Sequence, residues 1–207
     1  MIQECFFDEE HFDISDVDIE YDISAISAEP FIEYDNKLNS CSFTGHRILS
    51  PQEKIKLLPI LKSTVLYLVA QGVKEFHCGG ALGFDTLAAT VVFDVSREHP
   101  EIKLILEIPY ENQASRWNED DRRIYEFIKT KASAVNIHSE KPKNKSEAVN
   151  ALLKRNRIMM DKSHYCVCYY KNKEKGGTAY TVNYAKLHDL QIINLAEQES
   201  QHGQEQI

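Results

Sequence analysis

Residues 74–98 read KEFHCGGALGFDTLAATVVFDVSRE, and this stretch is the clearest guide to the fold class. Its first five residues are predicted to form a short strand, and the glycines at 79, 80 and 83 indicate a turn. Residues 84–98 then carry apolar side chains at helical spacing. A strand that passes through a tight turn into a helix is the repeating unit of parallel α/β sheets. The stretch therefore predicts an α/β fold, provided that the unit recurs along the chain.

The unit does recur. Further strands are predicted at 40–43, 102–108, 134–137, 165–170 and 191–195, in addition to 74–78. Between them lie helical patterns that start after Ser50, cover 84–98 and 118–131, start after Ser146 and cover 178–188. Ser50, Pro51 and Glu53 form a capping box with proline at the first helical position, which is a strong helix start. This alternation predicts βαβ units and a parallel sheet.

Apolar residues at helical spacing indicate which side of two of these helices is buried. The predicted inward residues are Ile55, Leu58, Leu61, Val65, Leu68 and Val69 in the first helix, and Ile124, Phe127 and Ile128 in the third.

Charge divides the chain into an acidic arm and a mildly basic body. Residues 1–36 hold 12 of the 32 acidic residues and no Lys or Arg, whereas all 24 basic residues lie in the remainder. We therefore predict an acidic N-terminal arm (1–39), one folded domain (40–195) and a polar C-terminal tail (196–207). The arm also alternates apolar and acidic residues between Phe12 and Ile23. It is either a disordered arm or one that packs on its own body or on another protein.

Composition excludes several classes of protein. The 207 residues contain no apolar run approaching the ~20 residues that span a bilayer, so we expect no membrane insertion. The first residues after Met1 include acidic side chains but no basic residue and no long apolar run, so we expect no secretory signal. Five cysteines without framework spacing indicate free thiols and a cytoplasmic protein.

Ligands of parallel α/β sheets bind beyond the carboxyl ends of the strands. The candidate ligand-binding residues are therefore those that follow each strand: Thr44, Gly45, His46 and Arg47; Gly79, Gly80, Ala81, Gly83 and Asp85; Tyr110, Asn112 and Trp117; and Gly176, Gly177, Thr178 and Thr181.

Two of these loops, 79–85 and 176–178, place glycines directly before a helix. Glycine lets the backbone approach an anion closely, and a helix N-terminus offers N–H groups and a positive dipole. Neither loop has the spacing of the dinucleotide fingerprint or of a Walker loop. The two loops together predict a phosphate site. Asp85 either caps its helix or accepts a hydrogen bond from a ribose hydroxyl.

Three further candidates, Arg155, Asn156 and Arg157, lie within a predicted helix. Arginine suits bidentate contact with phosphate, although a solvated helical face explains the spacing equally well. Tyr110 and Trp117 could stack on a base or simply pack in the core. We expect no metal site, because Cys166 and Cys168 lack a second pair of ligands. No catalytic residue can be assigned from spacing.

Five separated motifs occur here in a fixed order. They are 42–47 (SFTGHR), 80–85 (GALGFD), 111–114 (ENQA) with Trp117, 155–157 (RNR) with Met159 and Asp161, and 176–185 (GGTAYTVNYA). This succession resembles the YpsA-like family of the SLOG superfamily. The resemblance implies a Rossmann-like parallel sheet with helices on both faces, a nucleotide or nucleotide-derived ligand and a homodimer.

The chain departs from the related phosphoribohydrolases at two positions. Their Pro-Gly-Gly-x-Gly-Thr-x-x-Glu pattern ends in a catalytic glutamate, whereas this chain has Lys175 at the proline position and Asn183 at the glutamate position. A neutral amide cannot act as a general base, so the resemblance does not establish an enzyme.

We therefore expect a module that senses or sequesters a nucleotide-derived ligand, with no obligatory cofactor. The alternatives are a hydrolase that cleaves an N-glycosidic or phosphate bond, and a single-strand DNA binder like DprA. The modest charge of the body disfavours nucleic acid.

Overall fold

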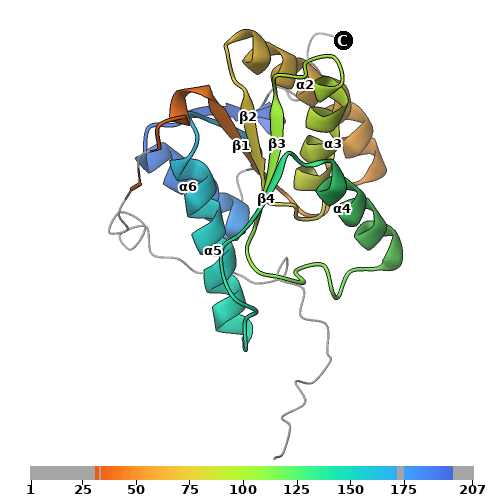
Figure 1. The fold of residues 1–207 in the computed structure, drawn as a ribbon, viewed down its shortest axis with the longest axis vertical. Helices are drawn as coiled ribbons and strands as arrows, with labels where there is room; N and C mark the ends of the chain where they lie inside the picture. The colour runs from red at the N-terminus through yellow and green to blue at the C-terminus, as the bar shows by residue number, and fades with distance from the viewer. Residues whose placement is uncertain (1–30, 33, 172–174, 198–207) are drawn as a thin grey trace, which may run out of the picture.

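The computed structural model describes residues 31–32, 34–171 and 175–197. Its centre is a six-stranded sheet. Figure 1 shows this sheet with helices packed around it. All strand pairs are parallel, and the strand order is β4-β3-β2-β1-β5-β6. The predicted α/β class and parallel sheet are therefore confirmed. The strands are β1 (Ser40–Gly45), β2 (Glu75–Cys78), β3 (Lys103–Ile108), β4 (Ala134–Ile137), β5 (Tyr165–Tyr169) and β6 (Gln191–Asn194).

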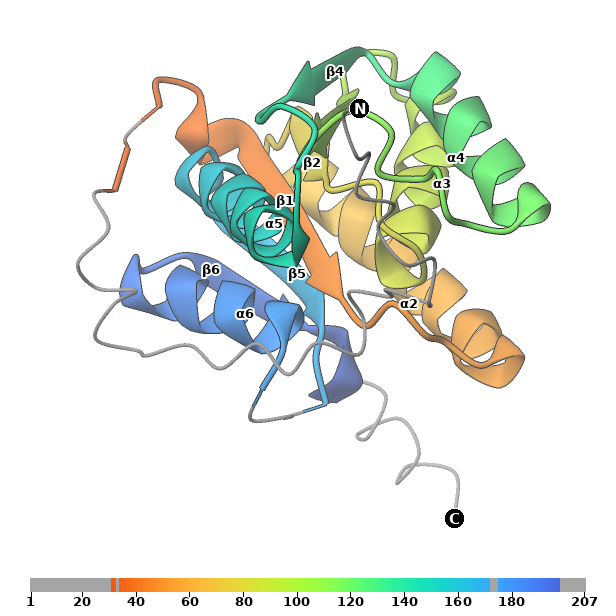
Figure 2. The same cartoon turned by 90° about the horizontal axis from the view of Figure 1, so that it is seen from below.

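Helices cover both faces of the sheet (Figure 2). One layer contains α2 (Pro51–Ala70), α3 (Phe84–Ser96) and α4 (Glu119–Lys131), and the other contains α5 (Lys145–Asp161) and α6 (Gly177–Leu187). The chain steps outward from β1 to β4 through the first layer, and α5 returns it to the other side of β1. The loops after β1 and β5 therefore diverge to opposite faces, which creates a crevice at the carboxyl ends of these two strands.

Local sequence accounts for the helix starts, with one correction. Ser50 and Glu53 form the predicted capping box at the start of α2, and α2 continues through Pro59. The predicted cap of α5 at Ser146 is wrong. Asn144 caps this helix instead, because its Oδ1 accepts the backbone N–H of Glu147.

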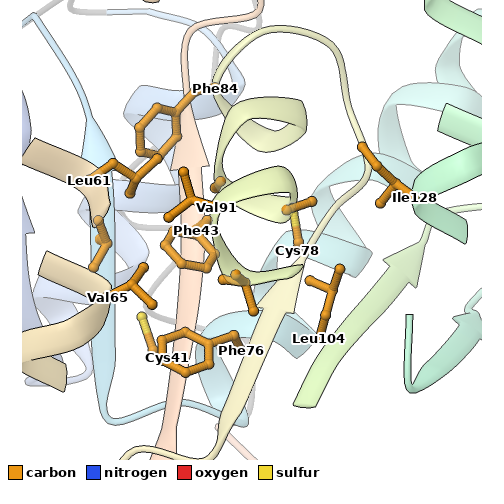
Figure 3. Close-up of a cluster of buried hydrophobic side chains, with 14 of the residues drawn as sticks. Cys41, Phe43, Leu61, Val65, Phe76, Cys78, Phe84, Val91, Leu104 and Ile128 are labelled. Carbon is orange, nitrogen blue, oxygen red and sulfur yellow. The ribbon is translucent and has the colours of Figure 1, made fainter. Parts of the chain in front are cut away.

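The larger hydrophobic core fills the space between the sheet and the layer of α2, α3 and α4. Phe43 of β1 and Phe76 of β2 lie in this core beside Val91 of α3 (Figure 3). A smaller core under α5 and α6 includes Met160 and Tyr184.

Four of the residues predicted to point inward do not. In α2, Ile55 and Leu58 are exposed, because the stripe that includes Leu57, Leu61 and Leu68 faces the sheet. In α4, Ile124 and Phe127 are exposed, while Tyr125 and Ile128 are buried.

The acidic arm lies mostly outside the described residues. Its described end is packed on the body: the Phe31 ring stacks on His188, just after α6, with ring centroids 4.6 Å apart, and Lys37 Nζ lies 4.1 Å from the Phe31 ring centroid. Tail residues 198–207 also fall outside the described range. Within that range, the structure contains no helix that is both long and apolar enough to cross a membrane.

Gly83 tests how tightly the loop after β1 packs on α3, and Gly72, which also has a positive φ, serves as the control. Gly83 has φ +74°, and a Cβ there would overlap the backbone carbonyl of Arg47, whereas Gly72 has φ +93° and open space around it. We expect Gly72→Ala to lower the free energy of unfolding by about 1–2 kcal/mol through backbone strain alone. Gly83→Ala should cost about 3 kcal/mol or more, because the clash adds to the strain. Urea unfolding of both variants measures the difference, and equal costs would contradict this account.

Candidate functional site

A pocket of about 390 Å³ lies at the carboxyl ends of β1 and β5. Its walls come from the loops after β1, β2 and β5, from one side of α5 and from the starts of α2, α3 and α6. Of the candidates predicted from sequence, the lining contains Thr44, Gly45, His46, Arg47, Ala81, Asp85, Arg155, Asn156, Gly176, Gly177 and Thr178. Residues from four separate motifs thus meet at one place.

The remaining candidates lie outside this lining: Gly79, Gly80, Gly83, Tyr110, Asn112, Trp117, Arg157 and Thr181. Trp117 packs edge-on against Tyr125, with centroids 5.3 Å apart, and belongs to the core. Arg157 donates to the Tyr180 hydroxyl (2.9 Å) and lines a different concavity, beside the loop before α5. Asn112 occupies a turn position with φ +61°.

The lining also includes residues that the sequence analysis missed: Phe43, Ile48, Glu53, Leu152, Leu153, Tyr170, Lys171, Lys175 and Ala179. Tyr170, Lys171 and Lys175 follow β5, so the strand-end rule could have found them. Glu53 gave no such signal, because it reaches the pocket from the first turn of α2.

The start of α6 opens into the pocket. Gly176 is its N-cap with φ +106°, the described residues provide no side-chain cap, and the first turn carries no acidic residue. A Cβ on Gly176 would meet nothing within 4 Å, so there is room beside this helix start. The Thr178 hydroxyl donates to the Gly45 carbonyl (3.0 Å) and holds α6 against the end of β1. This arrangement favours an anion, because the helix N-terminus carries positive dipole.

Arg155 is a structural member of the pocket wall. It is only 3% exposed, and its Nη1 donates to the backbone carbonyls of Gly79 and Glu107. Its Nε donates to Asn156 Oδ1 (2.8 Å). Burial lowers the pKa of Arg155, and the nearby carboxylate of Asp85 opposes this shift. The guanidinium therefore joins the ends of β2 and β3 as well as facing the pocket.

Asn156 links Arg155 to α6 through hydrogen bonds. Its Nδ2 donates to Thr181 Oγ1 (2.8 Å), and the Thr181 hydroxyl donates to the Gly177 carbonyl (2.7 Å). Thr181 thus acts behind the pocket wall, and the first turn of α6 is fixed from two sides.

Asp85 is the buried carboxylate of the pocket. It is 7% exposed, and its Oδ2 accepts the backbone N–H of Ala81 (3.4 Å). Burial raises the pKa of Asp85, while Arg155, the Ala81 N–H and Arg47 act against that rise. Because arginine stays protonated in proteins, the ionised carboxylate is the form that compensates the buried guanidinium.

The lining of the pocket is cationic overall. It contains Arg47, Arg155, Lys171 and Lys175, against the acids Glu53 and Asp85. Lys171 Nζ lies 2.5 Å from Glu53 Oε1, and this hydrogen bond is the main cause that lowers the pKa of Glu53 to about 2. His46 Nε2 accepts the backbone N–H of Lys171 (3.1 Å), which joins the two loops.

A buried ion network adjoins the pocket wall and was not foreseen from the sequence. Glu107 is fully buried; His77 Nδ1 (2.9 Å) and Lys162 Nζ (2.8 Å) bond its Oε1, and His138 Nε2 (2.5 Å) bonds its Oε2. Burial alone would raise the pKa of Glu107, but the hydrogen bonds from His138, His77 and Lys162 outweigh it and hold the pKa well below its usual range. Because the Glu107 carbonyl also accepts from Arg155, this network anchors the arginine.

The part of the chain that the structure describes contains no group of His, Cys, Asp or Glu side chains arranged to hold a metal ion. Its four cysteines (Cys41, Cys78, Cys166 and Cys168) are buried and free. Burial raises the pKa of the Cys41 and Cys78 thiols, which is typical of inert core cysteines.

Comparison with known proteins gives the following matches. A family model described as the YspA SLOG family matches residues 50–196. A UPF0398 protein of Bacillus cereus strain B4264 is 32% identical over 126 residues, which cover 61% of this chain and 67% of the relative. A UPF0398 protein of Bacillus thuringiensis strain Al Hakam is 31% identical over the same shares.

Two solved structures share the fold. DNA processing protein A (DprA) from Streptococcus pneumoniae has a TM-score of 0.53 at 16% identity; the match covers 82% of this chain and 57% of that chain. DprA from Helicobacter pylori, described by its single-stranded DNA binding mode, has a TM-score of 0.52 at 15% identity and covers 88% and 84%. At these identities the likeness concerns the fold alone.

The Glu107 network gives a prediction for stability. Glu107→Gln removes the charge that compensates Lys162 in a buried site, so we expect a loss of about 3–5 kcal/mol in the free energy of unfolding. The control is Glu75→Gln, whose exposed pair with Lys103 (3.3 Å) should be worth no more than about 1 kcal/mol.

The effect of Glu107→Gln on the free energy of unfolding should depend on pH. A carboxyl group with a depressed folded-state pKa stabilises above its unfolded pKa of 4.5, and that stability is lost as the pH falls below it. The difference between wild type and Glu107→Gln should therefore shrink in acid. A constant difference from pH 7 to pH 3 would count against the network.

Proposed function

Because the chain belongs to the YspA SLOG family, we propose that its pocket binds a nucleotide or nucleotide-derived molecule through a phosphate group. The observation that carries this proposal is the start of α6, which opens into the pocket with no side-chain cap from the described residues. Arg47, Lys171 and Lys175 on the lining add positive charge around that helix start. A phosphate there would accept backbone N–H bonds and be attracted by the dipole and these cations.

We place this module among binding proteins that sense or sequester their ligand. Asn183, at the position of the catalytic glutamate in related hydrolases, is half-buried and is not part of the lining. Of the acids on the lining, Glu53 is paired with Lys171, and Asp85 accepts a backbone N–H beside the arginines. Each carboxylate has a structural partner, so neither is arranged as a solvent-facing general base.

The same binding experiments would also reveal either of two other activities. Release of free base or of phosphate from a bound nucleotide would favour a hydrolase. Binding of an oligonucleotide with a steep dependence on salt would favour the single-strand DNA reading, which fits the fold shared with DprA.

Arg47 supplies the first test. Arg47→Gln should weaken binding of nucleotides at least about tenfold, because a hydrogen bond to a charged group contributes about 1.5–3 kcal/mol. The control is Arg97→Gln, which changes an exposed arginine after α3 and should leave the affinity unchanged. Titration calorimetry with a panel of mono-, di- and trinucleotide phosphates measures both. A panel in which wild type binds nothing would refute the proposal.

Arg155 and Arg157 supply a second test, since the structure directs them to different places. Arg157→Gln should change the affinity less than twofold, because Arg157 lies outside the pocket lining. Arg155→Gln should abolish binding and also destabilise the fold, because two backbone carbonyls lose their donor. Equal loss of affinity in the two variants, with both still folded, would contradict this assignment.

A further inference from the structure

The two glycine loops differ in one respect that bears on which ligand fits. We infer that the carboxylate of Asp85 is a built-in anion that takes the place of a phosphate in the loop 79–85, so that the pocket accepts one phosphate group, at the start of α6. This inference rests on the proposed function for the identity of the ligand. The role of Asp85 itself rests on contacts within the chain.

The contacts show that the first loop is already occupied. Asp85 is the second residue of α3, yet its carboxylate points back into the loop and accepts the backbone N–H of Ala81. A Cβ built on Gly79 would lie 2.7 Å from Asp85 Oδ2 and would overlap Arg155 Nη1. Gly79 is therefore required for the close approach of the Asp85 carboxylate and the Arg155 guanidinium.

The first turn of α3 is also less open to an anion than the first turn of α6. The backbone N–H of Phe84 donates to the His46 carbonyl (3.1 Å), and the Ala81 N–H is taken by Asp85. Among the described residues neither helix start has a side-chain cap, but the first turn of α3 carries the acidic Asp85, whereas the first turn of α6 carries no acidic residue. The two helix starts are thus unequal, although their sequences look alike.

Electrostatics adds to this difference. Burial raises the pKa of Asp85, and the nearby guanidinium groups of Arg155 and Arg47 act against that rise. A second anion in loop 79–85 would face a carboxylate across a few ångströms in a buried site, where like charges repel strongly. A neutral hydroxyl group, in contrast, can donate a hydrogen bond to that carboxylate.

These constraints define a class of ligand: a phosphomonoester, such as a nucleoside monophosphate, whose phosphate lies at α6 and whose sugar hydroxyls face Asp85. Ligands with a second phosphate that would extend toward loop 79–85 are disfavoured. Asp85 is in this sense a residue that determines specificity.

The test removes the negative charge of the Asp85 side chain and keeps the shape of that side chain. Asp85→Asn is compared with wild type and with Asp94→Asn, a matched change on the same helix where an exposed aspartate pairs with Lys62 (2.7 Å). The probes are inorganic phosphate, pyrophosphate, a nucleoside monophosphate and the corresponding diphosphate, all at one ionic strength. Phosphorus NMR titration and thermal shift report binding and confirm that each variant is folded.

We expect Asp85→Asn to bind pyrophosphate and the diphosphate at least tenfold more tightly than wild type, with less than threefold change for inorganic phosphate at its first site. Asp94→Asn should match wild type throughout. Unchanged or weaker pyrophosphate binding by folded Asp85→Asn would overturn the inference.

Two further readouts keep the result decisive. Wild type should bind one inorganic phosphate per chain at saturation, and two would overturn the inference even if Asp85→Asn failed to fold. If wild type binds no phosphate or nucleotide, the proposed function fails. The role of Asp85 is then still decided by whether Asp85→Asn alone acquires a phosphate site.

Discussion

The guanidinium of Arg155 holds the ends of β2 and β3 together while it forms part of the pocket wall. It donates to the carbonyls of Gly79 and Glu107, and its Nε reaches Asn156. A buried cation of this kind persists only if its hydrogen bonds and its charge are both compensated. Asp85 lies near it on the pocket side, and Glu107 lies behind it with its own cluster of His77, His138 and Lys162. The shape of the pocket thus depends on electrostatic compensation below its surface.

Glycine has a spacing role in the same region. A Cβ on Gly45 would lie 2.6 Å from the Phe84 ring, and one on Gly83 would overlap the backbone of Arg47. These two positions press the loop after β1 against the start of α3. Such close packing uses the same residue type as an anion-binding loop, so composition alone cannot separate the two roles.

Much of the fold could be read from the sequence because it depends on local signals. The strand-turn-helix unit recurs, and the capping box at Ser50 and Glu53 starts α2 where expected. Prediction failed where two apolar stripes compete on one helix. In α4, Ile124 and Phe127 offered one stripe, but packing of Tyr125 against Trp117 selected the other.

The residues of the site were likewise predictable from the sequence only in part. The strand-end rule collected Arg47, Asp85 and Gly176, because the topology of a parallel sheet fixes where strand ends meet. It could not foresee Glu53, which arrives from a helix, or the Glu107 network, whose members are joined only in three dimensions. Helical geometry predicts that Arg155 and Arg157 point about 200° apart, but which of them faces the pocket depends on how α5 is rotated on the sheet.

The pairing of β1 with β5 has a consequence for how the molecule assembles. Gly45 is in register with Tyr169, so the two halves of the crevice come from distant parts of the chain. Strands β1 to β4 can join through successive local crossovers, whereas β5 must close a loop that contains all of them, at a cost in chain entropy. We therefore expect the wall formed by β5 and α6 to complete the crevice late in folding and to be its first part to open. The larger core takes only Val167, Tyr169 and Leu195 of its buried residues from this segment, and the rest come from earlier parts of the chain.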